Sequence, residues 1–275
     1  MIVDFHSHNF PASVAPRAMA QMCRMTAGTL WAAGDGSLTS HLGALMSAGV
    51  DKAVVCSIAT KPSQWSFILR RAQAIQSGEL GAEAARRLVP FGSVHPLDSD
   101  FAAHLEAFAA AGIKGVKFHP YYQNFSLADP AVWPLFAKIA DLGLIVVCHT
   151  GGDVSWKDLT GMCGPADVAK LLDAVPDLAP RFVAAHLGGC FRYAPHATDV
   201  LLARGCWADT SALHLRWHMD EEMRLLRTWP TERLLFGTDY PWVHYPEALR
   251  WVRTYRAAED LPAILGENAR QLLGL

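Results

Sequence analysis

The chain has 275 residues, of which 51% are hydrophobic and 18% are charged, so it can build a large core and is not a disordered protein. Its 24 Lys and Arg residues nearly balance 26 Asp and Glu residues, which gives a formal net charge of −2. Because the chain has neither a basic excess nor a run of like charges, the electrostatic pattern of a nucleic-acid-binding protein is excluded.

Eight short runs of β character recur along the chain, each ending in a polar or glycine-rich cluster. Several are almost continuously apolar, as expected for parallel strands buried on both faces. Their ends are spaced by roughly 30 residues, the length of a βαβ unit. We therefore predict an α/β fold, a (β/α)₈ TIM barrel formed by residues 1–275 as one domain, with an open doubly wound sheet as the alternative. The predicted strands are residues 2–8, 52–58, 88–95, 113–119, 144–149, 182–186, 206–210 and 234–239.

The segments between these strands carry apolar residues at helical spacing, as in Phe101, Leu105 and Phe108. The longest connection, Asn9–Leu38, is rich in Ala, Met, Pro and Gly, and we expect it to form a long active-site loop or lid. The tail over residues 266–275 predicts a final helix that packs on the barrel.

Features of export or membrane insertion are not expected. Apolar runs such as residues 142–148 are far shorter than the roughly 20 residues of a membrane helix, and Asp4 and His6 stand where a leader would be basic and then apolar. The six cysteines include no C-x-x-C pair, which is typical of reduced thiols. We expect a cytoplasmic protein without a membrane partner.

The chemistry-bearing residues fall where strands end. In a (β/α)₈ barrel the reactive groups come from the C-terminal ends of the strands, so these positions test the prediction. Six of the twelve histidines lie there, together with a lysine and an aspartate: His6, His8, His95, Lys117, His119, His149, His186 and Asp239.

The first strand carries a pair of histidines. His6 and His8 are two residues apart, so both imidazoles project from the same side of a strand and can clamp a metal. A carboxylate from Asp239 completes a mixed nitrogen and oxygen ligand set for a divalent ion. An isolated H-x-H pair is often incidental, but further histidines at the ends of strands five and six favour the metal interpretation.

Six motifs in the same order resemble the amidohydrolase superfamily. They are D-F-H-S-H near the N-terminus, G-V-K-F-H-P on strand four, C-H-T-G on five, A-A-H-L-G-G on six, F-G-T-D-Y-P on eight and the closing G-E-N-A-R-Q-L-L. More narrowly they resemble its amidohydrolase-2 branch, which includes metal-dependent hydrolases and decarboxylases similar to aminocarboxymuconate semialdehyde decarboxylase. The resemblance runs from residue 4 to the C-terminus.

The resemblance implies that His6, His8, His149 and Asp239 bind the metal, with Zn²⁺ as the first expectation. His186 then assists proton transfer or polarises the substrate. A divalent ion lowers the pKa of a bound water from 15.7 to about 7, and Asp239 accepts the proton of that water. Structural alternatives are an Asx-turn at Asp239, a core histidine at His149 and a hydrogen bond to the following turn at His186.

Strand four and strand three leave alternatives open. Lys117 and His119 share one face of strand four, so both can point into the barrel mouth. In binuclear members of the superfamily a lysine at this position can be carboxylated and bridge two metals, and Lys117 can have that role. Alternatively, Lys117 can anchor an anionic substrate or form an ion pair. His119 can add a metal ligand or polarise the substrate. One ion is expected, with two as the alternative. His95 has either a direct role or that of a polar strand cap.

Aromatic and basic residues that follow strand ends are candidates for the pocket wall. An arginine can also clamp a substrate carboxylate with two parallel hydrogen bonds. The wall candidates are Tyr121, Tyr122, Trp156, Arg192, Trp242 and His244, and the clamp candidates are Arg24, Arg192 and Arg216.

The expected function is hydrolysis of an amide, lactone or ester-like carbonyl of a small molecule by a metal-activated water. The alternative is a metal-dependent non-oxidative decarboxylase of a small carboxylic acid, which two arginines converging on the pocket would favour. A barrel that binds without turnover is the third hypothesis. The absence of P-loop, G-x-G-x-x-G, G-x-S-x-G and H-E-x-x-H motifs argues against nucleotide, serine-hydrolase and zincin chemistry. The resemblance favours a homodimer or larger assembly.

Overall fold

The computed structural model describes residues 1–26, 32–156, 161–189, 196–211 and 219–275. Within them, eight parallel strands pair in chain order. Bridges from Gly92 to Val116 and from Ser7 to Tyr240 join the two groups of strands into a closed barrel. The strands are β1 (Val3–Ser7), β2 (Lys52–Cys56), β3 (Leu88–Phe91), β4 (Gly115–Phe118), β5 (Ile145–Cys148), β6 (Phe182–Ala184), β7 (Trp207–Asp209) and β8 (Leu234–Leu235).

This barrel confirms the (β/α)₈ prediction and rejects the open sheet. Every predicted run contains one strand, but the ladders end one to four residues earlier than predicted. The predicted third strand, for example, extends to His95, whereas β3 ends at Phe91. The polar residues at the predicted ends therefore lie in the loops that follow the strands.

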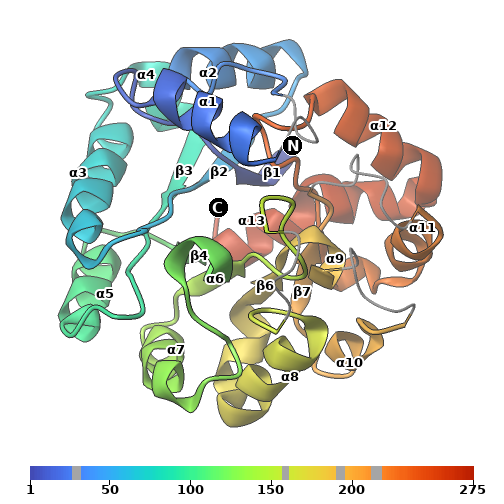
Figure 1. Ribbon diagram of the computed structural model, residues 1–275. Helices are drawn as coiled ribbons and strands as arrows, with labels where there is room; N and C mark the ends of the chain where they lie inside the picture. The colour runs from blue at the N-terminus through green and yellow to red at the C-terminus, as the bar shows by residue number, and fades with distance from the viewer. Residues whose placement is uncertain (27–31, 157–160, 190–195, 212–218) are drawn as a thin grey trace.

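Helices surround the strands (Figure 1). They are α1 (Ala15–Met25), α2 (Leu38–Ser47), α3 (Trp65–Gln76), α4 (Ala82–Arg87), α5 (Phe101–Ala110), α6 (Pro120–Gln123), α7 (Trp133–Asp141), α8 (Pro165–Ala174), α9 (Ala185–Gly189), α10 (Asp199–Leu202), α11 (Met219–Thr228), α12 (Tyr245–Tyr255) and α13 (Asn268–Leu273). No described helix has the length and apolar character that crossing a membrane requires.

The side chains of each strand alternate between two apolar layers. On β2, Ala53 and Val55 pack outward against the helices, whereas Val54 and Cys56 point into the barrel. The interior layer also contains Leu273 of α13. In Figure 1 α13 lies behind the strands, at the end opposite α1 and α6. The predicted final helix is thus present, and it covers the N-terminal end of the barrel.

The connection Asn9–Leu38 differs from the expected loop, because its first half forms α1. Its Ala and Met residues, which the prediction read as loop composition, are strong helix formers, and Pro16 lies in the first turn, where proline is tolerated. Ala15 and Met19 are buried. The segment therefore covers the barrel mouth with a helix rather than with an irregular loop.

Candidate metal centre

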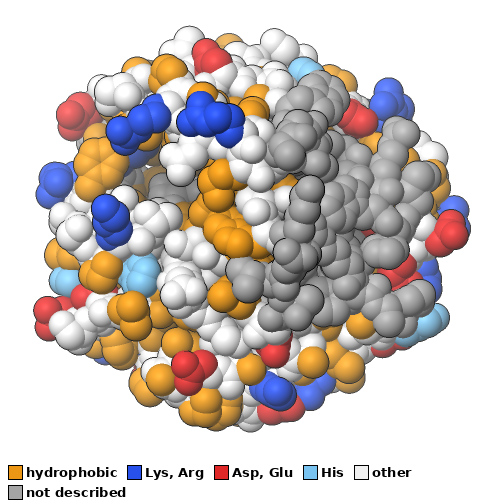
Figure 2. All heavy atoms as spheres, in the orientation of Figure 1, with side chains coloured by type: hydrophobic (Ala, Val, Ile, Leu, Met, Phe, Trp, Pro, Cys, Tyr) orange, Lys and Arg blue, Asp and Glu red, His pale blue; other side chains and the backbone are white. Residues whose placement is uncertain are grey.

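A cavity of about 520 Å³ opens at the C-terminal end of the barrel. On this face hydrophobic side chains gather near the centre, and Lys and Arg side chains lie over α1 and α3 (Figure 2). Nine residues predicted for the site line the cavity: His6, His8, Lys117, His119, Tyr122, His149, His186, Asp239 and Trp242. The strand-end rule therefore brings most of the predicted site together.

A bulge in β1 positions the two histidines of the first strand. Asp4 pairs with Ala53 and Ser7 with Val55, so β1 uses one more residue than β2 over this stretch. The extra residue lets Phe5 and His6 both face the barrel interior, although they are neighbours in sequence. His8 follows on the same side as His6, as predicted.

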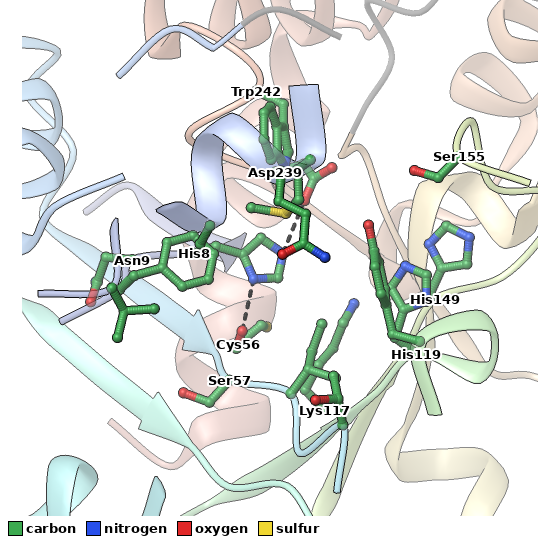
Figure 3. Close-up of a pocket in the computed structure, with 18 of the residues that line it drawn as sticks. His8, Asn9, Cys56, Ser57, Lys117, His119, His149, Ser155, Asp239 and Trp242 are labelled. Atoms are coloured by element: carbon green, nitrogen blue, oxygen red, sulfur yellow. Dashed lines mark hydrogen bonds and ion pairs between the residues drawn. The ribbon is translucent and has the colours of Figure 1, made fainter. Parts of the chain in front are cut away.

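The hydrogen bonds of His8 define its tautomer. Its Nδ1 lies 2.7 Å from the carbonyl oxygen of Cys56, which can only accept, so Nδ1 carries the proton (Figure 3). In a neutral His8 the Nε2 lone pair then faces Asp239 Oδ1 at 3.1 Å. Two acceptors at this distance repel each other unless a proton or a metal ion lies between them. The facing His8 Nε2 and Asp239 Oδ1 atoms therefore fit a cation bound by both.

His6 is oriented in the same way. Its Nδ1 lies 2.9 Å from Asp209 Oδ2, and its Nε2 lies 3.6 Å from the same Asp239 oxygen that His8 approaches. Imidazole held by a carboxylate or a carbonyl is the usual outer-shell arrangement of metal-binding histidines. His6, His8 and Asp239 offer three ligand atoms within 4.8 Å of one another. The donor set of two imidazoles and one carboxylate fits a divalent metal ion.

Lys117 lies beside this group and is almost fully buried. Its Nζ is 2.9 Å from His6 Nε2, where it donates to the lone pair that faces Asp239. The ammonium group thus supplies positive charge at the nitrogen that a metal ion would use. This contact with His6 is not one of the three roles that the sequence analysis left open for Lys117.

His149 lies with a second group. Its Nδ1 is 3.0 Å from His186 Nε2, and its ring stacks on His119 with centroids 4.0 Å apart. His119 Nε2 in turn lies 3.3 Å from Asp153 Oδ2. Of the predicted ligands, the structure thus brings His6, His8 and Asp239 together, whereas His149 groups with His119 and Asp153.

His186 is held by an unusual backbone. It and the next two residues have left-handed conformations, with φ of 59°, 51° and 74°. Its amide donates to Asp209 Oδ1 at 2.9 Å, and its Nδ1 lies 2.8 Å from Ser211 Oγ. The turn at the end of β6 directs the imidazole into the cavity rather than back along the strand.

Asp209 and Ser211 were missed by the sequence analysis. Burial opposes ionisation of Asp209, but His6, His186 and Ser211 lower its pKa overall. Asp209 therefore binds as a carboxylate between the histidines of β1 and β6. The signal for it was present, because Asp209 and Ser211 alternate at the end of the predicted seventh strand, as His6 and His8 do at the first.

The ionisation states of the site favour metal binding. Burial lowers the pKa of His186 to about 4, and burial followed by the charge of Lys117 lowers that of His6. These imidazoles are neutral near pH 7 and keep a lone pair. Burial would raise the pKa of Asp239, but the neighbouring His8, His6 and His186 lower it overall, so this carboxyl is ionised.

The remaining wall residues divide into two groups. Tyr122 and Trp242 line the cavity, whereas Tyr121 and Trp156 do not; the Trp156 ring packs behind Tyr122 at 4.9 Å between centroids. His95 also lies outside the lining, and its Nδ1 accepts from the amide of Leu97 at 3.1 Å, as expected for a polar strand cap.

The arginines differ from the sequence expectation. Arg24 and the aromatic-wall candidate His244 are exposed and do not line the cavity. Arg192 and Arg216 lie outside the described residues. Instead Arg17 of α1 and Arg71 of α3 contribute to the lining.

The comparisons with known proteins concern the family and the fold. The sequence model of a family described as amidohydrolase matches residues 60–275. No match was found among curated proteins. An uncharacterised TIM-barrel protein of Bordetella bronchiseptica superposes with a TM-score of 0.73 at 19% identity, over 99% of this chain and 98% of that one.

Two further structures share the fold. A probable 2-pyrone-4,6-dicarboxylic acid hydrolase of Acinetobacter baumannii, with citric acid bound, has a TM-score of 0.66 and 16% identity, over 100% and 99% of the two chains. A 5-carboxyvanillate decarboxylase of Novosphingobium aromaticivorans, complexed with manganese and 4-hydroxy-3-methoxy-5-nitrobenzoic acid, has a TM-score of 0.68 and 15% identity, over 100% and 96%. At these identities the likeness concerns the fold.

Proposed function

Because this chain belongs to the amidohydrolase family, we propose that it is a metal-dependent hydrolase acting on an amide, lactone or ester-like carbonyl of a small molecule. The observation that carries the proposal is the Asp239 carboxylate oxygen facing the Nε2 atoms of His8 and His6 at 3.1 and 3.6 Å beside the cavity. A divalent ion in this group supplies Lewis acidity toward a water molecule and a substrate carbonyl.

The residues around the ion would have different roles. His6, His8 and Asp239 would hold the metal, and the second Asp239 oxygen would accept a proton from the attacking water. Lys117 would have to give up its bond to His6 for Nε2 to bind an ion, because two cations would compete for one lone pair. His149 would join the ligand set through Nε2 only if that nitrogen left its contact with the carbonyl oxygen of Gly152, 3.3 Å away.

His186 and His149 form the proton route of the proposal. Their Nε2 and Nδ1 atoms are 3.0 Å apart, so one of them holds a proton that the other accepts. Ser211, 2.8 Å from the other nitrogen of His186, fixes the direction of that ring. The pair can therefore return a proton to the leaving group after Asp239 has taken one from water.

Decarboxylation of a small carboxylic acid is the second candidate. The observation that favours it is the presence of Arg17 and Arg71 in the cavity wall, since arginine binds carboxylates with two parallel hydrogen bonds. Both reactions use the same metal cradle, and they differ in whether water enters the product.

Labelled water separates the two reactions. Carboxylate-bearing lactones, amides and esters, and carboxylated phenols, are assayed with metal-loaded protein in oxygen-18 water. Hydrolysis incorporates one labelled oxygen into the product acid, whereas decarboxylation releases carbon dioxide and leaves the organic product unlabelled. Activity that survives removal of the metal by a chelator contradicts both candidates.

The identity of the ion is part of the proposal. We propose Zn²⁺, which accepts imidazole and carboxylate ligands, with Mn²⁺ as the alternative because three similar structures were solved with manganese. Metal content per chain, measured by elemental mass spectrometry, tests the proposal of a single ion. Two ions per chain would point to the second group around His119 and Asp153.

A further inference from the structure

Arg71 is a half-buried cation that faces the cavity without a carboxylate partner. It lies on α3 and lines the cavity, and its Nη2 donates to Asn9 Oδ1 at 2.6 Å. Within the described ranges no carboxylate oxygen comes within 4.0 Å of its guanidinium. Arg204 and Arg224, by contrast, each pair with an acidic side chain.

The cost of this burial points to an anion. Desolvation lowers the pKa of Arg71, although a guanidinium remains charged at any physiological pH. A guanidinium presents five donors, and the bond to Asn9 uses one of them. A ligand carboxylate accepts two parallel bonds from the remaining donors and offsets the unpaired charge.

A directed chain of hydrogen bonds holds Asn9 in place behind the arginine. Because Arg71 can only donate, the Asn9 amide oxygen faces it and the amide nitrogen donates to His41 Nδ1 at 3.0 Å. His41 therefore donates from Nε2 to the Tyr245 hydroxyl at 2.9 Å, and Tyr245 bonds to Asp4. All four of these supporting residues are buried, so Arg71 is tied to a rigid wall.

This wall is next to the candidate metal centre. Asn9 directly follows His8, whose Nε2 faces Asp239. In the view of Figure 3, His8 lies between Asn9 and the pair formed by His119 and His149. Asn9, to which Arg71 donates, is thus on the side of His8 away from His119 and His149 in this view.

The charge of the cavity favours the same kind of ligand. Its described lining contains three cationic side chains, Arg17, Arg71 and Lys117, against two carboxylates, Asp153 and Asp239. Both carboxylates already contact histidines. A divalent ion would raise the positive charge further. The lining beside Arg71 includes Phe67 and Ile68, which suit an apolar ligand body.

We propose that Arg71, oriented by Asn9, is a subsite for a substrate carboxylate that is not itself the reacting group. This assignment rests on the proposed function for the meaning of "substrate", but the subsite itself is a binding property that can be measured without turnover. The substrate is then a small apolar compound with a carboxylate at one end and the scissile group at the other.

The test compares two probes by isothermal titration on metal-loaded protein. Benzoate has one carboxylate and isophthalate has two, so the ratio of their dissociation constants reports the gain from the second carboxylate while the contribution of the metal cancels. We expect isophthalate to bind about 10- to 100-fold more tightly, the range of a charge-assisted hydrogen-bonded pair. In Arg71→Gln the ratio should fall to roughly the statistical factor of two.

Arg70→Gln is the matched control, because Arg70 is the preceding residue of the same helix, is exposed and does not line the cavity. It should keep the wild-type ratio. Asn9→Asp gives a second test that keeps the arginine, since a carboxylate at this position neutralises Arg71 and should also abolish the gain. Circular dichroism checks that each variant is folded.

Each outcome decides the assignment. No gain for isophthalate in the wild type, or an equal loss in Arg70→Gln, overturns the subsite. Phenyl phosphate binding more tightly than benzoate, with the difference lost in Arg71→Gln, reassigns the subsite to a phosphate. A ratio that depends on Arg71 in a protein without metal-dependent turnover supports the subsite and contradicts the proposed function.

Discussion

The two ends of the barrel differ in the side chains that point into its interior. At the N-terminal end, interior side chains such as Val3 and Ile145 meet Ala269 and Leu273 of α13 in an apolar cluster. At the C-terminal end the interior positions carry imidazoles, a lysine and carboxylates that bond to one another around a cavity.

The difference teaches where stability and chemistry are located in this fold. Apolar burial at the closed end contributes to the free energy of unfolding, because filled space there is lost if a side chain is shortened. The open end holds buried polar groups that need partners or a metal, so it costs stability in exchange for reactivity. Substitutions at the two ends should therefore affect different measurements.

Asp239→Asn should have the largest effect on catalysis. Asparagine keeps the size of the side chain and tolerates the left-handed backbone of Asp239, whose φ is 62°. It cannot accept the proton of water, so we expect kcat to fall about a thousandfold, or about 4 kcal/mol of transition-state stabilisation. Asp141→Asn, on the exposed end of α7, is the control. Near-normal kcat in a metal-loaded Asp239→Asn protein would show that another group is the base.

Leu273→Ala probes the closed end. Leu273 is 1% exposed in the interior cluster, so its truncation should lower the free energy of unfolding by about 2–5 kcal/mol and leave kcat of the folded enzyme unchanged. Denaturant unfolding measures the first quantity and a steady-state assay the second. Leu275→Ala removes the same atoms two residues away, where the side chain is 43% exposed, and should cost little. A large fall in kcat in Leu273→Ala would break the division between the two ends.

Asp209→Asn tests the support of the metal ligands. Asp209 holds His6 through Nδ1, and loss of such an outer partner lowers metal affinity by about 10- to 100-fold. Competition with a chelator dye measures this affinity. Asp220→Asn, an exposed residue of α11, is the control. An unchanged affinity would mean that His6 is not a metal ligand.

His41→Gln should produce a smaller effect that depends on pH. Burial lowers the pKa of His41 from its ordinary 6.5 to about 3, so the unfolded chain gains a proton below pH 6.5 that the folded chain refuses. Because of His41, the free energy of unfolding should fall by about 1.4 kcal/mol for each pH unit as the pH falls from 6.5 toward 3. Above pH 6.5 this residue should make no pH-dependent contribution.

The measurement is the pH dependence of the unfolding free energy between pH 6.5 and 4.5 in the two proteins. The glutamine variant should show the shallower slope, whatever its stability at pH 7. His244→Gln, the same substitution at an exposed histidine, is the control. Parallel slopes in wild type and His41→Gln would show that His41 is protonated in the folded protein.

The sequence predicted the strands well because buried parallel strands are short, apolar and regularly spaced. It predicted α1 poorly, since the Ala and Met residues of that segment were read as loop composition although they favour a helix. Strand ends were placed too late, because polar residues such as His95 follow the ladder without a signal for where pairing stops.

The site was predicted in the same uneven way. Residues that end strands were found, but their grouping depends on side-chain direction, and His149 bonds to His186 rather than to the pair on β1. Arg71 was not found because Arg70 and Arg71 are adjacent arginines, and the sequence pattern does not show which of them faces solvent. Only the placement of α3 against the barrel decides which of the two lines the cavity.

The bulge in β1 shifts, by one residue, which side chains of the strand face the barrel interior. Phe5 belongs to the apolar interior, and His6, the next residue, already belongs to the metal group. The interior can therefore be repacked around Phe5 without rotating the histidines, whereas deleting one residue here would turn both imidazoles out of the cavity. The extra residue of the bulge thus separates Phe5, where the core can accept substitutions, from His6 and His8, whose orientation the site requires.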